Sequence, residues 1–142
     1  MTTSLLEALE LIARGSVATT GLAIGHAGAD LTFPQWRVLV VVGEHEEGVT
    51  VSEIATRVGG HVSPVSRLVG RLERRGLVRA EKDSRDRRVT RVTLSDRGEA
   101  LRSEVLDRRR AALAAAIDGI DPLSPEAESA LIRIARSMLE FA

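Results

Sequence analysis

A helix pattern that runs directly into two strand patterns limits this chain to a few folds. The segment "SPVSRLVGRLERRG" predicts a helix with Ser63 as N-cap, Pro64 at the first helical position and Gly76 just past the end. Apolar residues at helical spacing predict its buried stripe, which comprises Val65, Leu68, Val69 and Leu72. The opposite face carries Ser63, Ser66, Arg67, Gly70, Arg71 and Arg74.

Two short strands are expected after this helix. The segments "LVRAEK" (residues 77–82) and "RVTRVTL" (residues 88–94) are joined by a charged loop. The second segment alternates apolar Val92 and Leu94 with polar residues, as a half-buried strand does. The pattern therefore predicts a β-hairpin with a charged tip.

Two further helices are expected before this unit, and a short one leads into it. Residues 4–27 have apolar positions near helical spacing, and a second helix begins near Pro34. Residues 50–58 predict the short helix, capped by Thr50 or Ser52, whose hydroxyls can instead contact a phosphate.

Two helices are also expected after the hairpin. Ser95 can cap a long one that ends at Gly119, and Ser124 with Pro125 begins the last one. The apolar face of the last helix is wider than one small monomer can easily cover. The order of elements predicts a mostly α fold with one β-hairpin, a winged helix-turn-helix with helical extensions at both ends.

Length and composition favour a single globular domain spanning residues 1–142, with 44% hydrophobic and 28% charged residues. The absence of cysteine excludes disulfides, thiolate metal sites and a thiol redox switch within this chain. The N-terminus does not resemble a signal peptide, and the longest uncharged run, between Arg14 and Asp30, is too short to span a bilayer. A cytoplasmic protein that binds no membrane is expected.

Charge is concentrated in the middle of the chain although the formal net charge is zero. Residues 61–110 carry 15 basic and 8 acidic side chains, whereas the segments on either side are net acidic. The preference for arginine over lysine can reflect the amino-acid usage of the source, but such a preference does not explain where the arginines lie. A localised anion-binding face is therefore expected.

A short helix, a "GGH" turn and a helix with a polar, basic outer face form the arrangement that places a second helix in the DNA major groove. Arg67 and Arg71 lie one turn apart and can contact guanine edges or phosphates. The alternative is that this face is simply solvated, but the hairpin beside it favours double-stranded DNA as the partner.

The chain resembles the MarR family of bacterial transcription regulators. The resemblance covers roughly residues 31–98 and is strongest from "LERRGLV" through "DSRDRR" to "VTLSDRG". Ser95 stands where the family more usually has threonine, and either hydroxyl can cap a helix. The resemblance implies a DNA-binding lobe at about residues 31–98 and a helical dimerisation region at about residues 1–30 and 99–142.

The resemblance also assigns DNA contacts to individual residues. In the wing, it implies that Arg88 begins the return strand and enters the minor groove, that Asp86 braces the wing by pairing with an arginine, and that Arg85 and Arg87 lie at the tip against phosphates. The matching recognition-helix residues are Ser63, Pro64, Val65, Ser66, Arg67, Arg71 and Arg74.

Members of the family act as homodimers, which agrees with the wide apolar face of the last helix. A two-fold dimer reads a pseudo-palindromic operator whose half-sites are about one helical turn, roughly 10 bp, apart. The resemblance implies a transcriptional repressor that a small aromatic or lipophilic effector releases from DNA, with no cofactor.

An effector crevice is expected between the dimerisation helices and the DNA-binding lobe, lined by His26, Trp36 and Arg37. Each residue has another interpretation, since Trp36 can be a core residue, Arg37 an ion-pair partner and His26 a surface or core side chain. Gly21 and Gly25 can widen the crevice, although close helix packing explains them more simply.

An enzyme is not expected. The three histidines lie on different elements without metal-ligand spacing, and no phosphate-binding loop or nucleophile motif is present. The remaining alternative is a winged-helix module that contacts proteins and not DNA. Such a module has little need to keep Arg67, Arg71, Arg85, Arg87 and Arg88 clear of the apolar positions.

Overall fold

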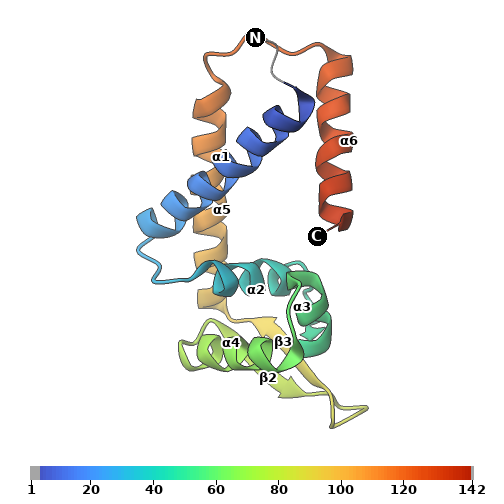
Figure 1. The fold of residues 1–142 in the computed structure, drawn as a ribbon. Coiled ribbons are helices and arrows are strands. Elements are labelled where there is room, and N and C mark those ends of the chain that lie inside the picture. Colours follow the sequence, from blue (N-terminus) through green and yellow to red (C-terminus); the bar gives the residue numbers. More distant parts are fainter. Residues whose placement is uncertain (1–3, 142) are drawn as a thin grey trace.

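The computed structural model describes residues 4–141 as a helical protein with a small sheet at one end (Figure 1). The expected winged helix-turn-helix with helical extensions is confirmed. In chain order the elements are α1 Leu5–His26, α2 Phe33–Gly43, β1 Val49–Thr50, α3 Val51–Val58, α4 Val62–Arg74, β2 Val78–Lys82, β3 Thr90–Leu94, α5 Asp96–Ile117 and α6 Pro125–Phe141.

The sheet has three antiparallel strands in the order β1-β3-β2, so β3 is its centre. Val92 of β3 lies opposite Ala80 of β2 and Val49 of β1, and its side chain is fully buried. The sequence predicted the hairpin of β2 and β3 but missed β1. A strand of two residues is too short to show alternation, and its second residue, Thr50, is also the N-cap of α3.

The larger hydrophobic core lies between the sheet and helices α2, α3 and α4. Leu39, Ile54 and Leu72 are fully buried there, one from each helix. Three members of the predicted stripe of α4 belong to this core, and the fourth, Leu68, packs against it partly buried. The amphipathic pattern of α4 therefore fixes which of its faces remains outside.

A second, smaller core joins this unit to the upper helices. Ala23 and Ile24 of α1, Trp36 of α2 and Val105 of α5 are buried together. Near it, the Arg102 side chain of α5 lies against Gly43 at the end of α2, where any larger residue would overlap its guanidinium. A positive charge is stabilised by the partial negative charge at the carboxyl end of a helix, so Arg102 contributes to the packing of α2 against α5.

Reciprocal capping boxes set the beginnings of three helices. In α1, α2 and α3 a hydroxyl of Ser4, Thr32 or Thr50 accepts from the third helical N–H, while a Glu or Gln there returns the bond. Thr50 is thus the cap of α3. Ser52 is not a cap, because it already lies inside the first turn.

The predicted start of α4 is wrong by two residues. The helix begins at Val62 with His61 as its N-cap, which makes no side-chain capping bond, so Ser63 and Pro64 are the second and third helical residues. Proline is tolerated there because the first N–H groups of a helix have no partner within it. The predicted cap at Ser95 is confirmed, since its Oγ accepts from the Gly98 N–H at 3.0 Å.

Helix α6 stands apart from the rest of the chain, whereas α1 packs along α5 (Figure 1). Its described side chains are exposed or at most half-buried, and Ile132 and Leu139 are 53% and 78% exposed. Leu5, Leu6 and Leu11 of α1 are also exposed. Within residues 4–141 no helix combines the length and apolarity that a bilayer crossing requires.

The junction between hairpin and α5 is closed by a very close approach of two backbones. Ser95 donates its N–H to the Leu77 carbonyl at 3.1 Å and its hydroxyl to the Gly76 carbonyl. Gly98, one turn into α5, lies so near that any side chain there would overlap the Leu77 carbonyl oxygen. This contact ties both ends of the hairpin to one point.

We expect Gly98→Ala to lower the free energy of unfolding by about 1–3 kcal/mol, the usual cost of overpacking. Thermal or urea denaturation measures it. Gly15→Ala is the matched control, because an added Cβ in that exposed part of α1 meets nothing within 4 Å. The control should be neutral or slightly stabilising. Equal stability of Gly98→Ala and the parent chain would contradict the close contact.

Candidate nucleic-acid interface

Helices α3 and α4 form a helix-turn-helix whose turn is made by two glycines. Gly59 ends α3 in the left-handed conformation, with φ of 69°, and Gly60 follows it. Val65 and Val69 face the core, so the opposite side of α4 is presented outward. The outward side chains are Ser63, Ser66, Arg67, Arg71 and Arg74, all exposed.

Two further predicted recognition-helix residues, Pro64 and Val65, differ in their exposure. Pro64 is exposed in the first turn, as expected, but Val65 is only 2% exposed and belongs to the core. Its inclusion among the DNA contacts was wrong, because one helical position serves one face, and Val65 belongs to the buried stripe. Arg67 also contacts Ser63 on the outer face, with Nη2 3.4 Å from the hydroxyl.

The wing is the hairpin of β2 and β3 with the loop between them, and Asp83 organises its tip. One carboxylate oxygen of Asp83 accepts from the backbone N–H of Arg85 at 2.7 Å and of Asp86 at 3.3 Å. The other oxygen pairs with the Arg91 guanidinium from β3. The Asp83 side chain is only 12% exposed, so this group supports the loop from within.

The expected pairing of Asp86 with an arginine is present. Its carboxylate accepts from the backbone N–H of Arg88 at 3.0 Å and from the Nε of Arg88 at 3.2 Å. Asp86 also accepts through its carbonyl from the Val89 N–H, which closes a turn. For this reason Arg88 lies in the tip, and the return strand begins two residues later than predicted, at Thr90.

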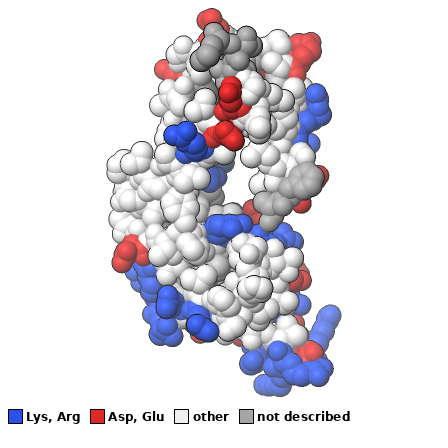
Figure 2. Space-filling model, viewed as in Figure 1, with Lys and Arg blue, Asp and Glu red and all other residues white. Residues whose placement is uncertain are grey.

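Three arginines therefore project from the wing tip. Arg85 and Arg87 are exposed, and the side chain of Arg88 is 92% exposed despite its bond to Asp86. Figure 2 shows Lys and Arg gathered around α4 and at the wing, at the lower end of the molecule, with a few acidic side chains among them, whereas the upper end shows both acidic and basic side chains. The local excess of positive charge predicted from the sequence thus maps onto the helix-turn-helix and the wing.

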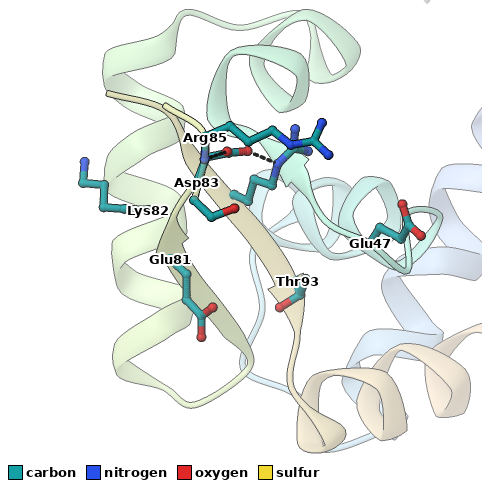
Figure 3. Close-up of a pocket in the computed structure, with 8 residues that line it drawn as sticks. Glu47, Glu81, Lys82, Asp83, Arg85 and Thr93 are labelled. Carbon is teal, nitrogen blue, oxygen red and sulfur yellow. Dashed lines mark hydrogen bonds and ion pairs between the residues drawn. The ribbon is translucent and has the colours of Figure 1, made fainter. Parts of the chain in front are cut away.

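A shallow groove runs along one side of the wing (Figure 3). Glu47, Glu81 and Asp83 alternate there with Lys82, Arg85 and Arg91. This mixed charge makes the groove a poor site for a polyanion. The anion-binding part of the wing is its tip.

The acids of the tip are held in their ionised form. The Arg85 N–H and then the Arg91 guanidinium keep the pKa of Asp83 below its ordinary value, and Asp83 in turn raises the pKa of Arg91. The Arg88 side chain and N–H likewise lower the pKa of Asp86. Near neutral pH, Asp83 and Asp86 are therefore ionised and can pair with the arginines that hold the tip in shape.

The sequence did not single out Asp83 and Arg91, although a local signal exists. An aspartate that accepts from the N–H two residues later is a common turn former, and "DSRDRR" contains that pattern twice, at Asp83 and at Asp86. The pairing of Asp83 with Arg91 depends on strand register, which places Arg91 opposite Glu81 and within reach of the loop.

The remaining predicted site residues lie in separate places. Ser52 is exposed at the start of α3, and Thr50 is committed to capping that helix. His26 is exposed at the end of α1, whereas Trp36 is 3% exposed in the smaller core. Arg37 donates to the carbonyls of Val58 and Arg57 at 2.7 and 3.4 Å and so caps the end of α3. These last three side chains therefore lie in different surroundings.

Comparison with known proteins agrees with this arrangement. The MarR family model matches residues 29–89, from the loop after α1 through the wing tip. The regulator TtmR of Methylorubrum extorquens is 38% identical over 76 residues, 54% of this chain and 38% of its own. The repressor IacR of Pseudomonas putida is 36% identical over 69 residues, 49% of this chain and 41% of its own. The matched stretch thus spans less than half the length of these curated relatives.

A solved structure extends the likeness to the helical ends. CouR of Rhodococcus jostii RHA1, crystallised with p-coumaroyl-CoA, superposes with a TM-score of 0.73 at 26% identity, covering 96% of this chain and 90% of its own. The chain resembles the MarR family in sequence over its DNA-binding lobe and in fold over nearly its whole length. TtmR and IacR are both named as transcription regulators.

We expect the carboxyl group of Asp83 to titrate below its ordinary pKa of about 3.8 when followed by NMR. Because the folded pKa is lowered, the stabilisation of the wing is present above that ordinary value and is lost as pH falls through the lowered one. Arg91→Ala should raise the midpoint. Arg87→Ala is the control, because Arg87 is a nearby cation with no recorded bond to Asp83. A midpoint at the ordinary value in the parent chain would contradict the brace.

Proposed function

We propose that this chain is a homodimeric, sequence-specific DNA-binding transcription regulator of the MarR family, a repressor that a small molecule releases from its operator. The observation that carries the DNA-binding part is the common placement of the exposed arginines of α4 and of the wing tip. Both lie at the end of the molecule farthest from the upper helices. A duplex that approaches this end meets more exposed arginines than acids, because Asp83 and Asp86 at the wing tip are bonded to Arg91 and Arg88.

The two arginine groups suit different grooves. Ser63, Ser66, Arg67 and Arg71 lie on one exposed face of a helix, which the major groove admits. The wing tip is a narrow loop with Arg88 almost fully exposed, which suits the minor groove, where arginine reads groove width and A·T character. Arg74, Arg85, Arg87 and Ser52 lie where they can contact phosphates.

Dimerisation is supported by apolar surface that one chain leaves open. The described part of α6 has no buried residue, and α1 exposes several leucines at its beginning. Apolar surface of this extent usually marks an interface. We assign residues 1–30 and 99–142 to dimerisation and about 31–98 to DNA binding. Two copies related by a two-fold axis then present two recognition helices to a pseudo-palindrome.

Repression and effector release rest on the named relatives. IacR is named as a repressor, and CouR was crystallised with p-coumaroyl-CoA. We place the effector of this chain, an aromatic or lipophilic molecule, between the upper helices and the DNA-binding lobe. His26 lies at that boundary, but Trp36 and Arg37 have structural roles in the single chain and contribute only if the dimer rearranges them. A cytoplasmic location follows from the proposed DNA target.

Binding of the parent protein to duplexes selected from a random library should fall steeply with salt in fluorescence anisotropy. Arg88→Ala should weaken binding to A·T-flanked duplexes and reduce the slope of log affinity against log salt by about one. Arg110→Ala, which removes an equal charge from α5, should change neither. Failure to select or bind any duplex at low salt would sink the proposal and favour a protein-binding winged helix. Unchanged binding by Arg88→Ala would remove only the wing assignment.

Light scattering at micromolar concentration should give twice the chain mass of 15.3 kDa. Leu139→Glu places a charge on the most exposed large apolar residue of α6 and should shift the mass toward one chain. Glu140→Ala, at the next position, should remain dimeric. A parent protein with the mass of a single chain would contradict the dimer. Binding of DNA by one DNA-binding lobe would then still be tested by the anisotropy measurement.

A further inference from the structure

Gly70 lies in the middle of α4, on the face that carries the arginines. It forms the floor of a small hollow whose walls are Ser66, Arg67, Arg71 and Arg74. Glycine is the poorest helix former after proline, so its presence inside a helix of 13 residues calls for a physical reason.

The chain itself supplies no such reason. Gly70 does not have a positive φ, so its backbone conformation is open to any residue. A Cβ added there would meet only the far end of the Arg74 side chain, at 3.9 Å, which is ordinary contact. Gly98 and Gly43, by contrast, are pressed against Leu77 and Arg102. The space above Gly70 is open to whatever approaches α4 from outside.

The chemistry of the hollow selects what can enter it. Its floor is helical backbone whose N–H groups are already bonded within α4, so it offers Cα–H surface and no free donor. The three guanidinium groups around it can reach past its rim to acceptors on either side. A small apolar projection flanked by hydrogen-bond acceptors fits this description. In the major groove that projection is the 5-methyl group of thymine, beside purine N7 and O6 acceptors and phosphates.

Resting on the proposed DNA binding, we infer that Gly70 is a specificity-determining residue whose hollow receives a thymine methyl group of the operator. The Cβ of alanine would project from the same floor against which the thymine methyl packs, so the two groups would compete for that position. Glycine at this position lets α4 lie closer to the base pairs, and Arg67 and Arg71 gain reach to the adjacent base edges.

The test compares Gly70→Ala with the parent protein on duplexes that the parent selects from a random library. Gly70→Ala should raise the melting temperature, because alanine favours the helix, and yet weaken binding to the selected duplex about tenfold, at the typical discrimination of one base contact. Gly15→Ala is the matched control, with the same added methyl in an exposed stretch of α1. It controls for the effect of the added methyl on the melting temperature, which should be unchanged or slightly raised.

Replacing single thymines by deoxyuridine then removes one methyl group at a time. At one position in each half-site, deoxyuridine should restore most of the affinity of Gly70→Ala. Wild-type affinity of Gly70→Ala for the selected duplex would overturn the inference. An equal loss on every duplex, with no position rescued by deoxyuridine, would overturn the thymine assignment. If the parent protein selects no duplex, the proposed function itself fails, and that result is distinct from both.

Discussion

The contact between Gly98 and the Leu77 carbonyl is the constraint on which the DNA-facing end of this protein depends. It brings the start of α5 against the start of β2, while Ser95 binds the carbonyls of Gly76 and Leu77. The end of α4 and both strands of the wing thereby meet at one place. Because α5 also carries Val105 into the smaller core, the same contact relates the wing to the upper helices. In the proposed dimer, such a rigid joint would carry a movement of the upper helices to the wing.

Hydrogen bonds and ion pairs of two aspartates hold the charged side chains of the wing tip in place. Asp83 organises the loop and pairs with Arg91 on β3, and Asp86 turns back on Arg88. The acids orient the tip without cancelling its outward positive charge, since Arg85, Arg87 and Arg88 remain exposed. Replacing Asp83 and Asp86 by neutral residues would add net positive charge, but it would also remove the bonds that fix the loop and so the direction of its arginines. The tip thus depends on geometry as well as on charge.

Much of the fold could be read from the sequence because its signals are local. The stripe of α4, the cap at Ser95 and the hairpin pattern each depend on neighbouring residues, and all three are present. The features that the sequence did not predict depend on contacts between distant segments, or on which of two neighbouring residues faces the core. Strand β1 pairs only with β3, which is distant in the sequence, and the bond from Arg37 to the carbonyl of Val58 at the end of α3 joins two separate helices. Val65 could not serve both the core and the DNA face.

Hydroxyl-radical footprinting of the protein on a duplex that it selects from a random library tests the central claim most directly. Two wings and two recognition helices on one dimer predict protection that is symmetric about a two-fold centre. Backbone cleavage should be reduced around two major-groove segments about one helical turn, roughly 10 bp, apart, and in the minor grooves flanking them. A single unpaired patch, or protection without flanking minor-groove contacts, would contradict the joint action of α4 and the wing in a dimer.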